Sequence, residues 1–167
     1  TPSYTILDVV EQITIEDALL DTAVRNALGF GAEEPIYTDD LWTIEKLTIP
    51  EGVEDFSVIQ HLRSLRELSI QGGKDNDLSF LQKLNRIQKL SIHNISISDS
   101  ELSIIGSLPE LESLTLNKCD LSIADGLEKA VKLQYLDLSN NSISNIDALR
   151  NLNTLNKLIL HRNVVSE

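Results

Sequence analysis

The sequence is poor in cysteine, in aromatic residues and in long hydrophobic runs. A single cysteine, Cys119, occurs in 167 residues, so the chain can form neither an intrachain disulfide nor a cysteine-based zinc site. Aromatic residues make up only 4% of the chain, so aliphatic side chains must fill the core, which favours stacked repeats over a sandwich or a barrel. No apolar run approaches the roughly 20 residues that cross a bilayer, so we expect no direct membrane insertion by this segment.

Positive charge is also scarce, and the charges are unevenly distributed. The formal net charge is -12. Residues 1–43 contain nine acids and one base, Arg25, whereas residues 44–167 contain 17 acids and 13 bases. An acidic chain binds the phosphate backbone of nucleic acids poorly, so we expect no nucleic-acid partner. The change in composition near residue 43 predicts an N-terminal cap at 1–43, in one domain with the repeats at 44–167.

The main feature that is present is a repeat of about 22 residues. From Leu133 to Ile143 the sequence reads Leu-x-x-Leu-x-Leu-x-x-Asn-x-Ile, and the same spacing recurs from Leu155 and, with Cys119 in the Asn position, from Leu111. Three earlier copies are looser. The six copies start near residues 44, 65, 87, 111, 133 and 155. This template is the leucine-rich-repeat signature, which allows Asn or Cys at one position.

Each part of the repeat predicts a local structure. The x-Leu-x-Leu-x stretch predicts a short strand with its leucines facing inward, and strands of successive copies pair about 4.8 Å apart. The apolar spacing of three in the back half suits a short 3₁₀ turn. The Asn side chain can bond backbone groups where the chain leaves the strand. We therefore predict an α/β solenoid: a leucine-rich-repeat right-handed superhelix with a parallel concave β-sheet, a short 3₁₀/turn convex side and an N-terminal α-helical cap.

The cap is predicted because the first strand of a solenoid would otherwise expose its edge. We predict a helix with Thr14 as its N-cap and Asp17 three residues later, ending at Gly29 or Gly31. The predicted apolar side of this helix comprises Ile15, Leu19, Ala23, Val24, Ala27 and Leu28. A second short helix is expected from residue 38 or 39 through Trp42.

On these features the chain resembles the internalin-like leucine-rich-repeat proteins of bacteria. The 22-residue unit, clearest from Leu111 to Asn163, carries part of the likeness. The rest of the likeness lies in the sequence from Ile15 to Ile49, which is predicted to be helical and resembles the acidic cap that precedes the repeats in that family. The resemblance implies a surface-attached or secreted bacterial protein that binds another protein on its concave face.

The chain also departs from that family's pattern. Gly52, Gly73 and Ile95 fill the Asn position in the first three copies, and the third copy has two extra residues. We expect less regular curvature there. The sixth copy stops soon after Asn163 without its back half, so we expect the chain to be a piece of a longer protein.

The strand register predicts which side chains face a partner. The predicted partner-binding set on the concave face is Lys89, His93, Thr115, Asn117, Lys118, Tyr135, Asp137, Ser139, Lys157, Ile159, His161 and Arg162. All outward positions together carry five bases and three acids. Tyrosine and arginine are favoured interface anchors, so Tyr135 and Arg162 predict a basic-aromatic patch near the C-terminal end of the face. The expected partner is a protein of acidic or mixed charge, bound by a monomer.

No group of residues predicts catalysis. His93 and His161 share a strand position but lie three copies apart, roughly 14 Å along the sheet, which is too far to ligate one metal. His61 falls in a back-half turn, and Cys119 is expected to be buried and unreactive. The Asp-Asn-Asp sequence at residues 75–77 lacks the other ligands of a calcium-binding loop. We therefore expect no enzyme activity, no metal and no cofactor.

Three functions are compatible with the sequence. The favoured function is a protein-binding or adhesion module, located outside a bacterium or on its surface. The second is a cytoplasmic scaffold, resembling the 22-residue-repeat regulators that bind phosphatases. The third is a recognition domain attached to an enzyme that lies beyond Glu167.

Overall fold

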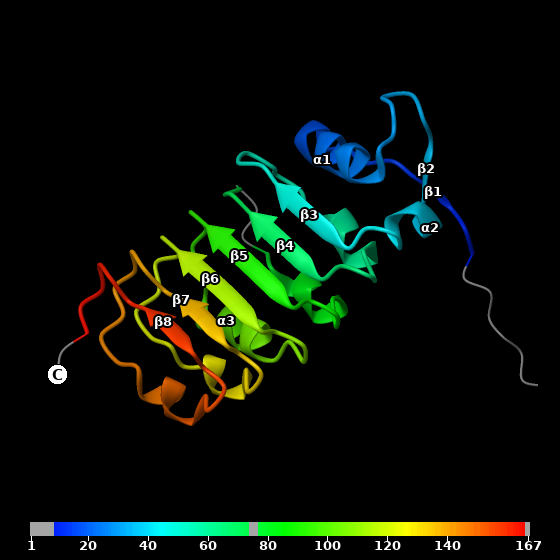
Figure 1. Cartoon of the computed structure of the whole chain (residues 1–167). Coiled ribbons are helices and arrows are strands. Elements are labelled where there is room, and N and C mark those ends of the chain that lie inside the picture. The colour runs from blue at the N-terminus through cyan, green and yellow to red at the C-terminus, as the bar shows by residue number, and fades with distance from the viewer. Residues whose placement is uncertain (1–8, 74–76, 166–167) are drawn as a thin grey trace, which may run out of the picture.

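The fold is a row of parallel strands with helical segments on one side. The computed structural model describes residues 9–73 and 77–165. Its parallel sheet has six strands in chain order: β3 (Lys46–Ile49), β4 (Glu67–Ile70), β5 (Lys89–His93), β6 (Ser113–Asn117), β7 (Tyr135–Asp137) and β8 (Lys157–Ile159). The segments that alternate with them are η1 (Ser57–His61), η2 (Ser79–Lys83), α3 (Asp99–Gly106), η3 (Leu127–Lys129) and η4 (Asp147–Asn151). Figure 1 shows the strands side by side, and the predicted leucine-rich-repeat solenoid is confirmed. None of the described helices has the length and hydrophobicity to span a bilayer.

One column of leucines runs through the interior. The paired residues are Leu47, Leu68, Leu90, Leu114, Leu136 and Leu158. The first five are at most 5% exposed, whereas Leu158 is 37% exposed, because β8 is the last strand of the described sheet. Complete burial of a leucine stabilises the fold by about 1.5–3 kcal/mol. Stacking therefore supplies each repeat with the apolar cover that it cannot provide for itself.

The cap helix starts later than the sequence predicts. Helix α1 spans Ala18–Leu28, and its N-cap is Asp17, whose Oδ1 accepts from the backbone N–H groups of Leu19 and Leu20 at 2.9 and 3.0 Å. The predicted N-cap, Thr14, is therefore wrong. A carboxylate at the N-cap satisfies two free helical donors and also interacts favourably with the helix dipole.

The shifted start also changes the buried side of the helix. Leu20 and Val24, which are four residues apart, are at most 1% exposed, whereas Leu19 is 45% exposed and Ala27 is also exposed. The predicted inward orientation of Leu19 and Ala27 is wrong. Gly29 ends the helix in the left-handed conformation with a φ of 73°, as predicted.

The remainder of the cap joins the helix to the first repeat. The other oxygen of Asp17 accepts from the N–H of Glu54 at 2.7 Å, and this bond is the main cause of its lowered pKa. Strands β1 (Gln12–Ile13) and β2 (Ile36–Tyr37) form an antiparallel pair that the sequence pattern does not predict. The predicted second helix is present as α2 (Thr38–Leu41).

The third repeat contains a true α-helix, α3, where a short turn was predicted. Ser98 is its N-cap and forms a capping box with Glu101, whose Oε2 accepts from the Ser98 N–H at 2.8 Å. Leu102 and Ile105 point into the core. The two extra residues of this copy thus lengthen the convex segment from a turn to a helix.

The Asn position performs its predicted structural role. Asn141 Oδ1 accepts from the N–H groups of Cys119 and Leu121 at 2.9 and 3.2 Å. Its Nδ2 donates to the carbonyls of Leu116 and Leu138, both at 2.8 Å. One amide thus ties two successive repeats together where their strands end.

Candidate functional site on the concave face

Side chains on the open face of the sheet form rows, because neighbouring strands pair in register. The first row consists of Lys46, Glu67, Lys89, Ser113, Tyr135 and Lys157. The second row consists of Thr48, Ser69, Ser91, Thr115, Asp137 and Ile159. The first row carries most of the charge, and the second row carries mainly hydroxyl groups.

The charges at the start of the first row are paired. Glu67 Oε1 lies 3.1 Å from Lys46 Nζ and 3.2 Å from Lys89 Nζ. Hydrogen bonds from Lys46 and then Lys89 lower the pKa of the Glu67 carboxyl. The two lysine side chains are 71% and 63% exposed, so these pairs orient the charges more than they stabilise the fold. This part of the row presents one net positive charge.

Two hollows lie over the N-terminal half of the concave face. The strand hollow, of about 320 Å³, is lined by residues of β3, β4, β5 and β6, among them Lys89, Ser91 and Thr115. The helix hollow, of about 460 Å³, lies between α1 and β3. It is lined by Leu19, Thr22, Ala23, Asn26, Ala27, Lys46, Leu47, Thr48 and Pro50. Lys46 and Thr48 line both, so the two hollows form one continuous surface.

The sequence pattern does not predict the helix hollow. Leu19 and Ala27 were assigned to the buried side of the cap helix, but they are exposed and line this hollow. The signal that could have identified them is Asp17 as the N-cap, because that start places Leu20 and Val24 on the buried side instead.

The predicted basic-aromatic patch is divided into two pairs. The Lys157 ammonium lies 5.4 Å from the centre of the Tyr135 ring, in cation–π range. Arg162 Nη1 donates to Asn140 Oδ1 at 3.2 Å. Tyr135 and Lys157 are the first residues of β7 and β8, whereas Asn140 and Arg162 follow the ends of these strands. The two pairs therefore lie at opposite ends of the last two strands.

The predicted contact residue Ser139 is not available to a partner. Its side chain is buried, with 1% exposure, and its Oγ accepts from Asn117 Nδ2 at 2.9 Å. Ser139 directly follows Leu138, and the chain turns inward toward the Asn141 bonds at this point, which takes its hydroxyl off the open face. Asn117 itself is half-buried beside it.

The other predicted contact residues remain at least partly accessible. His93 is half-buried, and its Nε2 lies 2.7 Å from Ser91 Oγ. Asp137 Oδ1 accepts from the N–H of Ser139 at 2.9 Å, which fixes the carboxylate close to its own strand. The rest of the set is exposed or half-buried: Lys89, Thr115, Lys118, Tyr135, Lys157, Ile159, His161 and Arg162.

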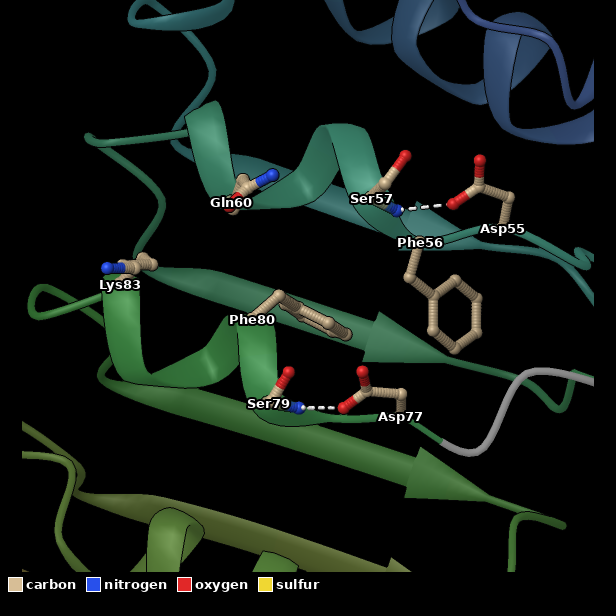
Figure 2. Close-up of a pocket in the computed structure, with 8 residues that line it drawn as sticks. All are labelled: Asp55, Phe56, Ser57, Gln60, Asp77, Ser79, Phe80 and Lys83. Atoms are coloured by element: carbon tan, nitrogen blue, oxygen red, sulfur yellow. Dashed lines mark hydrogen bonds between the residues drawn. The ribbon is translucent and has the colours of Figure 1, made fainter.

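A further hollow, of about 380 Å³, lies on the convex side between η1 and η2. Figure 2 shows the same arrangement in both repeats: Asp55 accepts from the N–H of Ser57 at 2.7 Å, and Asp77 from that of Ser79 at 2.8 Å. The rings of Phe56 and Phe80 meet edge to face, with centres 5.8 Å apart. These carboxylates begin the 3₁₀ turns, so the hollow follows from repetition of one turn sequence.

The single cysteine of the chain is buried in the core. The Cys119 side chain is 0% exposed, and burial raises the pKa of its thiol to about 12. The thiol is therefore protonated at neutral pH, as expected for an unreactive cysteine. Among residues 9–73 and 77–165, no three His, Cys, Asp or Glu side chains are grouped to hold a metal. Residues 75 and 76 of the Asp-Asn-Asp sequence lie outside the described residues.

The chain matches no protein-family model. It is 28% identical over 179 aligned residues to mouse tubulin-specific chaperone E, an alignment that covers 95% of this chain and 33% of that protein. Two internalin structures from Listeria monocytogenes are also similar. InlF gives a TM-score of 0.81 at 28% identity over 90% of this chain, and InlC2 gives 0.79 at 27% over 90%. TLR13, in its complex with ssRNA13, gives 0.61 at 28% over 79%.

The matches cover only part of these longer proteins. The chain spans a third of the mouse chaperone, 45% of the InlF chain and 67% of the InlC2 chain. The similarity therefore covers one repeat array and its cap rather than whole proteins.

Proposed function

We propose that this chain, whose fold is that of an internalin-like leucine-rich-repeat protein, is a non-catalytic module that binds a protein partner on its concave face. The main support is the continuous surface formed by the strand hollow and the helix hollow. Both hollows lie on rigid elements, since β3 to β6 are fixed by ladder hydrogen bonds and α1 by its caps. A preformed surface reduces the entropy lost on binding.

The chemistry of this surface favours a partner of mixed character. Leu19, Ala23 and Ala27 line the helix hollow and offer apolar contact. The strand hollow instead presents hydroxyl groups beside the Lys46–Glu67–Lys89 charges. We propose that an apolar side chain of the partner enters the helix hollow while polar groups cross the strands. The accessible residues of the predicted set extend this contact toward β8.

A matched pair of variants tests the placement of this site. Ser91→Arg puts a long charged side chain into the strand hollow, whereas Ser144→Arg makes the same change at an exposed position outside both hollows. We expect proteins retained by the unmodified chain to be lost with Ser91→Arg and kept with Ser144→Arg. The measurement is quantitative mass spectrometry of proteins captured from source-cell extract and medium, after circular dichroism has shown equal folding. Equal retention by both variants would refute the concave site.

The cellular setting has two candidates. Similarity to the two Listeria internalins supports the first, an adhesion or binding module outside a bacterium or on its surface. Similarity to mouse tubulin-specific chaperone E over 95% of the chain supports the second, an intracellular scaffold. Fractionation of source cells that express the natural full-length protein separates them. Recovery from medium or cell surface supports the first, and recovery only from cytosol supports the second.

A further inference from the structure

One side of the cap helix α1 faces the helix hollow rather than the core. The residues of α1 that line this hollow are three or four positions apart, so they share one side of the helix: Leu19, Thr22, Ala23, Asn26 and Ala27. The fully buried residues of α1, Leu20 and Val24, lie on a different side. The leucine and the two alanines of this set, together with Pro50, give the hollow its apolar part. Because alanine side chains are short, they leave room there for an apolar group of a partner.

Two hydrogen-bond donors stand at the boundary between the helix hollow and the strand hollow. Lys46 and Thr48 line both hollows, and both side chains are exposed. Among the described residues, the Thr48 hydroxyl has no hydrogen-bond partner. Lys46 Nζ lies 3.1 Å from Glu67 Oε1, but an ammonium group has three donors and this contact uses one of them. Both groups can therefore donate to one further acceptor at this boundary.

The charge of this surface suits a single carboxylate. The described side chains that line the two hollows include two lysines, Lys46 and Lys89, and one acid, Glu67. Two positive charges and one negative charge leave one positive charge, in a chain of net charge -12. Asp21, the one acid within α1, is already paired with Arg25 at 2.8 Å. A partner that carries one carboxylate close to an apolar side chain therefore complements the surface in both charge and polarity.

We propose that the partner supplies an extended internal segment in which an aliphatic residue and an aspartate or glutamate are separated by one residue. Side chains two positions apart in an extended chain point the same way, about 6.6 Å from each other. The aliphatic side chain enters the helix hollow, and the carboxylate accepts from Lys46 Nζ and the Thr48 hydroxyl. The segment then continues over the strand hollow, which reaches β6 and which a chain terminus bound at Lys46 would leave empty. This inference rests on the proposed function, because it gives the chemistry of the partner at the same site.

The test follows the methyl NMR signals of the helix hollow while synthetic peptides with blocked ends are added. The probe carries Leu-Ser-Asp-Ser-Leu between Gly-Ser flanks, which presents the segment in both chain directions with one carboxylate. One control replaces the aspartate with asparagine, and another replaces both leucines with alanine. We expect the probe to shift the methyl signals of Leu19, Ala23 and Ala27 in a saturable way. Each control should bind at least about threefold more weakly, because it lacks either the charge or the apolar side chain.

Two variants with the same charge change localise the carboxylate. Lys46→Gln removes the ammonium group at the boundary of the hollows, whereas Lys129→Gln removes one on η3, outside both hollows. With Lys46→Gln we expect the aspartate and asparagine peptides to bind within about twofold of each other, and with Lys129→Gln we expect the preference for aspartate to persist. Circular dichroism checks that both variants fold. An unchanged preference in Lys46→Gln, or equal binding of the two peptides to the unmodified chain, would overturn the proposal.

Two further outcomes separate this inference from its alternatives. Tighter binding of a peptide that ends in leucine with a free terminal carboxylate would overturn the internal segment in favour of a chain terminus. Absence of methyl shifts at several millimolar probe would overturn the inference alone, if Ser91→Arg still loses the captured proteins that Ser144→Arg keeps. Equal capture by those two variants would instead refute the concave site itself.

Discussion

Replacing Asn141 with alanine is expected to lower the free energy of unfolding by about 4 kcal/mol, because one side chain satisfies backbone groups of two repeats. The substitution leaves the N–H groups of Cys119 and Leu121 without their acceptor. It also removes the donor to the carbonyls of Leu116 and Leu138. Each buried group that loses its partner costs about 1–3 kcal/mol, and the effects are not fully additive. Urea denaturation followed by circular dichroism measures the loss.

The matched control for this prediction is Asn156→Ala. Asn156 is exposed, and its side chain has no hydrogen bond with another described residue. Its replacement should change the free energy of unfolding by less than about 0.5 kcal/mol. If both alanine variants unfold at the same urea concentration, Asn141 does not link the repeats in the way that the structure indicates.

Gly106→Ala is expected to destabilise the fold by about 3 kcal/mol, although alanine is the better helix former. Gly106 is the last residue of α3, and a Cβ atom there would lie 1.9 Å from the carbonyl oxygen of Gly126. The obstacle is backbone, so no change of side-chain rotamer removes the overlap. Helix propensity alone would predict a gain of up to about 1 kcal/mol, so the sign of the effect decides between packing and propensity.

Gly31→Ala is the control for this substitution. The nearest heavy atom to a Cβ at Gly31 is Glu34 Oε1 at 3.4 Å, an ordinary contact with a flexible side chain. We expect a change of less than about 0.5 kcal/mol in thermal or urea unfolding. A Gly106→Ala protein as stable as Gly31→Ala would show that α3 and the Gly126 turn do not pack as closely as described.

Features that repeat along the chain are the ones that sequence predicts well. The strands follow from the leucine spacing because residues such as Leu114 and Leu136 must alternate inward at every copy to bury a common core. The role of Asn141 follows for the same reason, since each copy leaves the strand at the same point and exposes the same backbone groups. Periodicity averages over local differences, so it identifies what all copies share.

Features that occur once are predicted poorly because they depend on competition between local signals. Thr14 and Asp17 are both acceptable N-cap residues, and in the structure Asp17 also accepts from the N–H of Glu54 in the first repeat. That bond joins residues distant in sequence and is invisible to a local pattern. Helix α3 is similar, since its two extra residues signal an irregularity without revealing its form.

In the candidate site, too, the repeated features are predicted well and the features that occur once are missed. The register predicts the rows that contain Lys89, Thr115 and Tyr135, because they follow from the strand period of two. It fails at Ser139, where the strand has ended and the chain turns inward. It also misses the helix hollow, because Leu19 is an apolar residue on a helix and its exposure depends on where that helix docks.

The concave site can be tested most directly by thiol labelling of single-cysteine additions in the captured complex. Cys119 can stay, because it is fully buried and its thiol has a pKa of about 12. Ser91→Cys places a reactive thiol in the strand hollow, and Ser144→Cys places one outside both hollows. If the partner occupies the concave face, maleimide labelling at position 91 slows by at least about tenfold in the complex, while labelling at position 144 keeps its free rate. Protection at position 144 with unchanged labelling at position 91 would contradict concave-face binding.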